Sequence, residues 1–169
     1  MIQGPSSRRV WVRLHDPGVF CHLRWIISQE KLAYCMGPIK LWTSLDPWSG
    51  MWLSTRLPDV SRAEIRPLCQ QDIDSISLVG AMNISAKFLA RNKRLALSQD
   101  DAPKLYELAR AAQTAGLTDL EDVAYFIRLA FAYGLDVLRW KETVASLGIA
   151  SSGTMSFVGA CSEYDRLCV

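Results

Sequence analysis

The pattern of apolar residues changes near residue 61, and this change constrains the fold more than any other feature of the sequence. Before it, short alternating segments are separated by turns of Asp, Pro and Gly. After it, apolar residues recur three or four positions apart, between capping residues and glycines. Alternation is typical of strands, and the longer period is typical of helices. The sequence predicts an α+β protein in which a small β-sheet with a hairpin and short helices precedes a helical C-terminal lobe.

The first part, residues 8–60, is predicted to be a small α/β lobe with one strand, two short helices and a hairpin. An Asp-Pro-Gly turn ends the strand, and Ser28 caps the second helix, which Gly37-Pro38 terminates. A turn at residues 46–50 connects the two hairpin strands. The expected elements are a strand at Val10–Leu14, helices at Val19–Ile27 and Gln29–Met36, and hairpin strands at Ile39–Thr43 and Met51–Leu57.

Residues 61–148 are predicted to form a lobe of four main helices. The strongest local signal is a capping box, with Thr118 at the helix start and Glu121 three residues later. Residues 149–169 are rich in Ser and Gly, and are predicted to be a loop or flexible tail. The expected helices are a short one at Ser61–Arg66 and longer ones at Gln71–Leu97, from the 98–103 segment to Gly116, from Thr118 to Tyr133, and at Val137–Leu147.

Composition excludes several classes of protein. The chain has 169 residues, of which half are hydrophobic, and a net charge of +2, so neither nucleic acid nor an anionic membrane attracts it strongly. No apolar run of about 18–20 residues is expected to cross a membrane, and no secretory signal is recognised. The five cysteines are widely spaced without a CxxC motif, which favours reduced thiols in the cytoplasm over disulfides or zinc.

Catalysis requires a reactive group beside a partner that activates it, and the sequence holds few such groups. The histidines are His15 and His22, and no GxSxG, Walker, GxGxxG or HExxH motif is present. His15 follows the expected strand beside Asp16, where a surface histidine is the simpler interpretation than an acid–base pair. A thiol enzyme that uses Cys21 or Cys35 with a histidine stays open as an alternative. No catalytic, cofactor-binding or metal-binding residue is predicted.

Two charged clusters have simple structural interpretations. The acidic residues of segment 119–122 lie in the first turn of an expected helix, where they complement the helix dipole. Arg91, Lys93 and Arg94 form the densest basic patch. Without interleaved aromatic residues, that patch is more typical of a solvated helix face than of a nucleic-acid site.

Six tryptophans are many for a chain of this size, and five of them precede residue 53. Core packing is the simplest interpretation for most of them. Trp48 stands in a turn beside Pro47 and Gly50, where burial is difficult, and an exposed tryptophan is a typical anchor for a protein partner. The predicted protein-interface residues are Trp48, Trp52 and Trp25.

Several segments occur in a characteristic order. VWVRLHDPGVF carries a strand into the Asp-Pro turn, QEKLAYCMGPIKLW passes through the Gly-Pro break, a tryptophan-containing hairpin follows, and GLTDLEDVAYFIRLAFAYG carries the capping box. Over about residues 9–148, this order resembles the C-terminal half of the effector chaperone, or adaptor, family of bacterial type VI secretion, encoded beside the VgrG spike protein. Members of that family commonly carry a further N-terminal α/β region before the Asp-Pro strand.

The resemblance implies a non-catalytic protein without a cofactor. Such an adaptor binds a secreted toxic effector in the cytoplasm and loads it onto VgrG, so the expected partners are these two proteins, with neither nucleic acid nor membrane. An immunity protein that neutralises a toxin is an alternative, because its composition is of the same kind. The small thiol or hydrolase enzyme is the other alternative.

Overall fold

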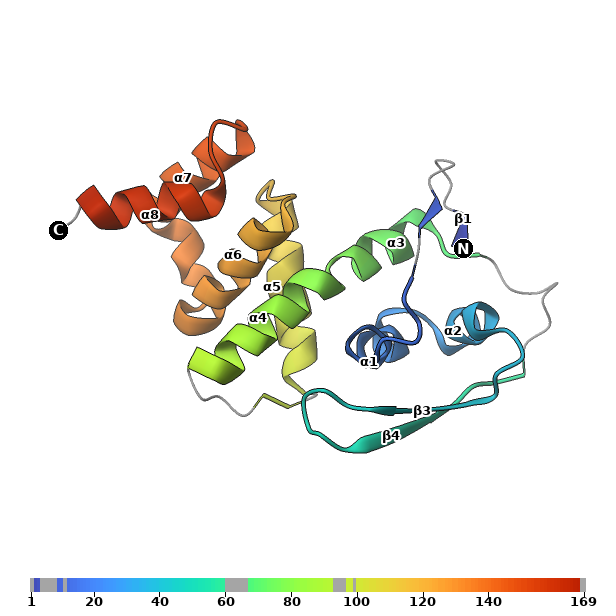
Figure 1. The fold of residues 1–169 in the computed structure, drawn as a ribbon. Helices are drawn as coiled ribbons and strands as arrows, with labels where there is room; N and C mark the ends of the chain where they lie inside the picture. The colour runs from blue at the N-terminus through green and yellow to red at the C-terminus, as the bar shows by residue number, and fades with distance from the viewer. Residues whose placement is uncertain are drawn as a thin grey trace. The chain divides into compact units, whose positions relative to one another are not determined.

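The computed structural model describes residues 2–3, 9–10, 12–59, 67–92, 97–98 and 100–167. The chain divides into two compact units, unit 1 up to Val79 and unit 2 from Gly80 onward. The described residues are mostly helical, with two short antiparallel strand pairs (Figure 1). The predicted α+β class with a helical C-terminal part is therefore confirmed. The units divide after Val79, whereas the sequence analysis placed the change of lobe after residue 60.

The helices of unit 1 begin and end at local sequence signals. Helix α1, Pro17–Ile26, starts at Asp16, whose carboxylate accepts a hydrogen bond from Gly18 N at 2.8 Å. The Asp-Pro-Gly segment thus starts a helix, with proline in the first turn where it is tolerated. Helix α2, Gln29–Met36, has the predicted bounds: Ser28 caps it, and Gly37 with φ 66° ends it.

The first predicted strand is wrong in most of its length. Strands β1, Ile2–Gln3, and β2, Arg9–Val10, form a small antiparallel sheet of their own. The predicted strand Val10–Leu14 does not continue past this pair into residues 12–14, because that segment turns toward the α1 cap, with Asp16 N donating to Arg13 O at 3.0 Å. Neither β1 nor β2 joins the hairpin, so the expected single sheet is two separate ones.

The predicted hairpin is present, although its first strand begins at Leu41 rather than Ile39 and ends at Leu45 rather than Thr43. Strands β3, Leu41–Leu45, and β4, Trp52–Arg56, pair in antiparallel register, with Leu41 opposite Arg56 and Leu45 opposite Trp52. In the connecting turn, Asp46 N donates to Met51 O at 2.8 Å.

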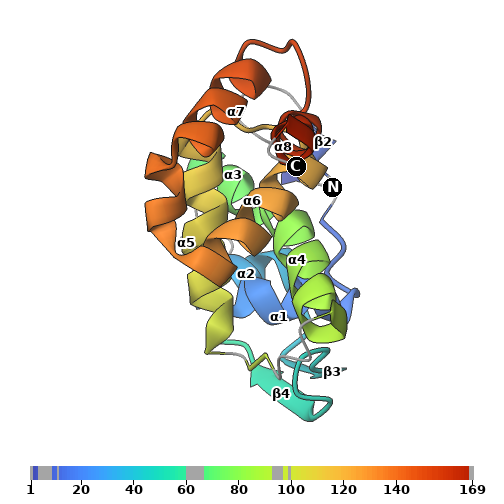
Figure 2. The same cartoon turned by 90° about the vertical axis from the view of Figure 1, so that its left-hand side faces the viewer.

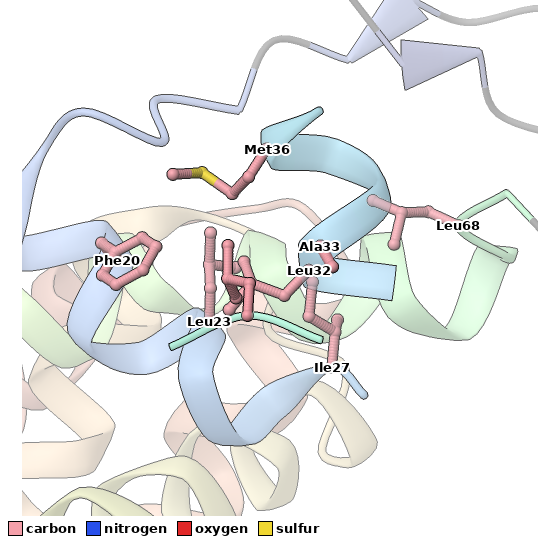
Figure 3. Packing of buried hydrophobic residues seen from close by; sticks show 8 residues of the cluster. Phe20, Leu23, Ile27, Leu32, Ala33, Met36 and Leu68 are labelled. Atoms are coloured by element: carbon pink, nitrogen blue, oxygen red, sulfur yellow. The ribbon is translucent and has the colours of Figure 1, made fainter. Parts of the chain in front are cut away.

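The core of unit 1 lies between α1 and α2 (Figure 3). Each fully buried large apolar side chain contributes about 1.5–3 kcal/mol relative to an exposed one. Helix α3, Gln70–Ser77, is joined to α2 by an ion pair between Lys31 Nζ and Asp72 Oδ2 at 2.6 Å. The buried members of the core are Phe20, Leu23, Ile27, Leu32, Ala33, Met36, Leu57 and Leu68.

The regular elements in the described part of unit 2 are helices (Figure 2). Helices α5 and α6 pack side by side, as do α7 and α8. Helix α4 was predicted to be continuous with α3, but the helix breaks at Leu78, whose N–H bonds to Ser75 O three residues back. The helices are α4, Val79–Asn92; α5, Asp101–Thr114; α6, Leu120–Tyr133; the 3₁₀ helix η1, Leu135–Arg139; α7, Lys141–Ser151; and α8, Phe157–Leu167.

The predicted capping box is wrong by one residue. Asp119, rather than Thr118, is the N-cap of α6, and its carboxylate accepts hydrogen bonds from Glu121 N at 2.9 Å and Asp122 N at 3.2 Å. An ionised carboxylate also interacts more favourably with the positive helix end than a hydroxyl does.

The C-terminal segments differ most from the prediction. The helix expected at Val137–Leu147 is a 3₁₀ turn, η1, followed by α7, because Trp140 between them is extended. The loop or flexible tail predicted for residues 149–169 is wrong, since α7 continues to Ser151 and α8 follows. The expected helix at 61–66 lies outside the described residues.

One helical stretch has the length and composition of a membrane-spanning segment. No such segment is expected from the sequence, but Gln70–Arg91, 22 residues within the described part of the chain, meets both criteria. Its Leu78, Met82 and Leu89 are buried in the protein. Since core helices of water-soluble proteins have the same character, this stretch is only weak support for a membrane location.

Candidate functional site

The hairpin has an inner face and an outer face, because successive side chains of a strand point to opposite sides. On the inner face, Trp42 packs against Phe20 of α1, with ring centres 5.8 Å apart, and Thr55 opposite it is buried. This packing attaches the hairpin to the core of unit 1. The outer hairpin face consists of the exposed residues Leu41, Thr43, Leu45, Trp52, Ser54 and Arg56.

The outer hairpin face is apolar at the end nearest the turn. Trp52 is 72% exposed and lies directly opposite Leu45, which is 42% exposed. Met51, just before Trp52, is 62% exposed. At the middle of the face, the hydroxyls of Thr43 and Ser54 share a hydrogen bond of 2.8 Å. We call the cross-strand pair Leu45 and Trp52, together with the exposed Met51 that precedes Trp52 at the turn, the hairpin tip patch.

The turn beneath this patch is held by its own polar groups. Asp46 is buried, and its Oδ2 accepts a hydrogen bond from Ser49 N at 2.9 Å and another from the Ser49 hydroxyl. Gly50 has φ 70°, a left-handed conformation that suits glycine. A turn closed in this way presents Met51 and Trp52 in a defined position.

The structure separates the three predicted interface tryptophans into two groups. Trp52 lies on the outer hairpin face. Trp48 instead folds back and places its ring edge-on to His22, with centres 5.4 Å apart, and Trp25 contacts the same imidazole at 5.9 Å. His22 is 1% exposed, so its two neighbours help to cover it. Trp48 is half-buried and Trp25 is 39% exposed.

Cys21, the neighbour of this histidine in the sequence, and Cys35 of α2 are poorly suited to nucleophilic chemistry. Burial, together with a smaller effect of the nearby Asp46 carboxylate, raises the pKa of Cys21 to about 12. Its Sγ donates to Gly18 O at 3.5 Å. Burial also raises the pKa of Cys35. Because the thiolate is the reactive form, both thiols are held in their unreactive form at neutral pH.

The acidic residues of segment 119–122 lie at the start of a helix, as predicted, but one of them is also buried. Within segment 119–122, Asp119 caps α6 and Asp122 is buried against α8. Among the described residues, no group of three or more His, Cys, Asp or Glu side chains is arranged to hold a metal ion. Arg91 is exposed on α4, whereas Lys93 and Arg94 lie outside the described residues.

Sequence reasoning missed two members of the hairpin tip patch. Leu45 and Met51 flank the turn cluster, and the alternation of the hairpin strands was the signal that could have placed Leu45 on the same face as Trp52. No protein-family model matches the chain, and comparisons with curated proteins and with solved structures also find no match. The function is therefore argued from the residues themselves.

Proposed function

We propose that this chain is a non-catalytic adaptor of a bacterial type VI secretion system. It binds a secreted toxic effector in the cytoplasm through the hairpin tip patch and loads it onto the VgrG spike. The observation that carries the proposal is the exposure of Trp52 beside Leu45 and Met51 on a turn of defined conformation. Exposed tryptophans with apolar neighbours are typical anchors of protein interfaces.

Two further observations support this function. The segment order that resembles the adaptor family includes the tryptophan-containing hairpin, and in the structure it is this hairpin that carries the patch. The thiol alternative is disfavoured, because Cys21 has its pKa raised to about 12 by burial and by Asp46. An adaptor needs neither a nucleophile nor a cofactor.

Co-purification from the native bacterium tests the proposal. The chain is tagged and expressed beside its neighbouring genes, and the captured proteins are identified by mass spectrometry. We expect an effector and VgrG to be recovered with the wild-type chain and to be lost with Trp52→Ala. Tyr34→Ala is the matched control, because Tyr34 is an exposed aromatic residue of the same unit on α2, outside the patch.

The same experiment identifies the rival functions. Capture of a toxin alone, together with protection of cells that express that toxin, would identify an immunity protein and contradict the adaptor. Equal recovery of the effector by Trp52→Ala and by the wild-type chain would show that the patch is not the binding surface.

A further inference from the structure

Arg128 of α6 is unusual because its charge has no anionic partner among the described residues. Its Nε is buried without a hydrogen bond, and none of the ion pairs in this part of the chain includes it. The guanidinium carbon instead lies 4.3 Å from the centre of the Phe88 ring on α4 and 5.4 Å from that of Tyr125 on α6. Stacking of this kind orients the planar group and leaves its charge unneutralised.

Three close approaches between α4 and α6 occur in the same order along the two helices. A Cβ atom added to Gly80 would lie 3.1 Å from Leu120 Cδ1. Further along, Ser85 Oγ donates to Ala124 O at 3.0 Å. In these two pairs, and in the pair of Phe88 and Arg128, the α6 residue number is about forty higher than the α4 residue number. The two helices therefore run in the same direction where they meet.

Basic residues of three helices lie at these ring contacts or within one helical turn of them. Arg91, exposed on α4, lies one helical turn after Phe88, whose ring contacts the Arg128 guanidinium. Lys104 of α5 extends over that turn, with Nζ 4.4 Å from the centre of the Phe131 ring. Arg128 lies one helical turn before Phe131. We call Arg91, Lys104 and Arg128 the α4–α6 basic cluster.

Carboxylates are sparse around this cluster. Helix α4 contains no Asp or Glu, and both acids of α6 lie in its first turn, about 9 Å along the helix axis from Arg128. On α5, Asp101 accepts hydrogen bonds from Ser98 N and Oγ. Glu107 is the remaining acid within one turn of Lys104. The positive charge of the cluster is therefore largely uncompensated by the helices that carry it.

We propose that the α4–α6 basic cluster binds a carboxylate of an acidic peptide segment, with Arg128 as the anchor. The planar guanidinium fits a carboxylate through two parallel hydrogen bonds, and stacking on Phe88 fixes it before binding. Arginine is enriched among the residues that dominate protein interfaces. Nucleic acid would require a longer basic track and stronger net charge than +2. This site lies in unit 2 and does not depend on the hairpin or on the adaptor proposal.

A peptide titration of the full chain tests the site. The probe is an octapeptide of alternating Glu and Gly, and its matched control replaces every Glu by Gln. Binding is followed by NMR, through the Nε–H signal of Arg128 and the backbone signals of α4 and α6. We expect the Glu peptide to shift these signals at low salt, more weakly as salt is added, and the Gln peptide to leave them unchanged.

Variants separate an anchor from a residue that merely adds charge. Arg128→Gln is expected to weaken binding at least about tenfold. Arg110→Gln, which removes the same charge from an exposed position of α5, is expected to change it less than about twofold. Arg128→Lys retains the charge without the planar fork, so it is expected to lie between them. A thermal melt of each variant confirms that it is folded.

Three results would overturn the site. The first is the absence of any shift by the Glu peptide, and the second is equal weakening by Arg128→Gln and Arg110→Gln, which marks general charge attraction. The third is tighter binding of a single-stranded DNA octamer than of the peptide at the same signals, which would identify a nucleic-acid site. If Arg128→Gln fails to fold, Arg128→Lys still decides, because affinity equal to that of the wild-type chain excludes the bidentate anchor.

Discussion

Asp122 Oδ1, in the first turn of α6, accepts a hydrogen bond from the backbone N–H of Val158, in the first turn of α8, at 3.1 Å. The next N–H of α8, that of Gly159, donates to Ser156 Oγ. Phe157, the residue before Val158, is buried, with its ring against those of Tyr125 and Phe126. Helix α8 is thus attached to α6 by a buried carboxylate and an aromatic cluster at the same point.

Removal of this carboxylate is expected to destabilise unit 2 and to loosen α8 first. Asp122→Ala should lower the free energy of unfolding by about 1–2 kcal/mol, the range for loss of a helix cap. Hydrogen exchange of α8 amides should accelerate more than that of α5 amides. Glu121→Ala is the control, since Glu121 is exposed and its side chain caps nothing in the described structure. If the α8 amides exchange at the same rate in Asp122→Ala and in the wild-type chain, Asp122 does not hold α8 against α6.

Helix α6 offers a direct comparison of two possible caps. Asp119→Ala should cost about 0.5–2 kcal/mol, because the Asp119 carboxylate accepts from two backbone N–H groups. Thr118→Ala, by contrast, should change the unfolding free energy by less than about 0.5 kcal/mol, as at an ordinary exposed position. Urea denaturation measures both values. A larger loss for Thr118→Ala than for Asp119→Ala would restore the capping box that the sequence suggested.

The ion pair between Lys31 and Asp72 should make stability depend on pH at both extremes. Partial burial raises the pKa of Asp72, but the hydrogen bonds from Lys31 and Cys69 together lower it by more than burial raises it, so the net shift is downward. The hydrogen bond to Asp72 raises the pKa of Lys31. The acid's contribution is therefore complete above its unfolded pKa of about 4 and lost as pH falls through the lower folded value. The lysine's contribution is complete below about pH 10.4 and lost as pH rises through its folded value.

Asp72→Asn should accordingly destabilise the chain by about 1 kcal/mol at pH 7, and the difference from wild type should shrink below about pH 4. Asp74→Asn is the control, because Asp74 is exposed on the same helix. Its carboxylate accepts a hydrogen bond from the neutral side chain of Gln70. Thermal melts across pH 2–8 provide the measurement. A difference that stays constant down to about pH 2 would exclude the ion pair as its source.

Cys21 should be the slowest of the described cysteines to react. With its pKa raised to about 12 by burial and by Asp46, the Cys21 thiolate is scarce at pH 7.5. Iodoacetamide labelling of the folded chain, read by mass spectrometry, should modify exposed Cys69 at least about a hundredfold faster than Cys21. Unfolding the chain in urea should abolish the difference. Faster labelling of Cys21 than of Cys69 would instead support the thiol enzyme.

Elements with signals at both ends were predictable from the sequence. Helix α2 has Ser28 at its start and Gly37-Pro38 at its end, and both act through bonds to residues within the same helix. The hairpin was equally predictable, since its alternation and turn residues are adjacent in the chain. Outer-face exposure of Trp52 also follows from that alternation.

Elements that depend on distant residues were missed. Helix α8 follows a Ser- and Gly-rich segment, and one of its N–H groups is capped by Asp122, which lies 36 residues earlier. The composition of the segment before α8 does not indicate that a distant carboxylate will cap the helix. Trp48 is similar: its turn predicts exposure, but folding brings it against His22 of α1. The position of Arg128 over the Phe88 ring was likewise not predictable, because the two residues lie on different helices.

The hairpin tip patch is the centre of the functional account, and a calorimetric titration tests it most directly. The effector that the proposed function expects to be encoded beside this chain is titrated into the wild-type protein, Trp52→Ala and the control Tyr34→Ala, with a thermal melt of each. Trp52 is 72% exposed, so its truncation should leave the melting temperature nearly unchanged. We predict that Trp52→Ala weakens binding by at least about thirtyfold, or 2 kcal/mol, while Tyr34→Ala binds like wild type. Equal affinity of Trp52→Ala and the wild-type chain, or no binding by the wild-type chain, would contradict the account.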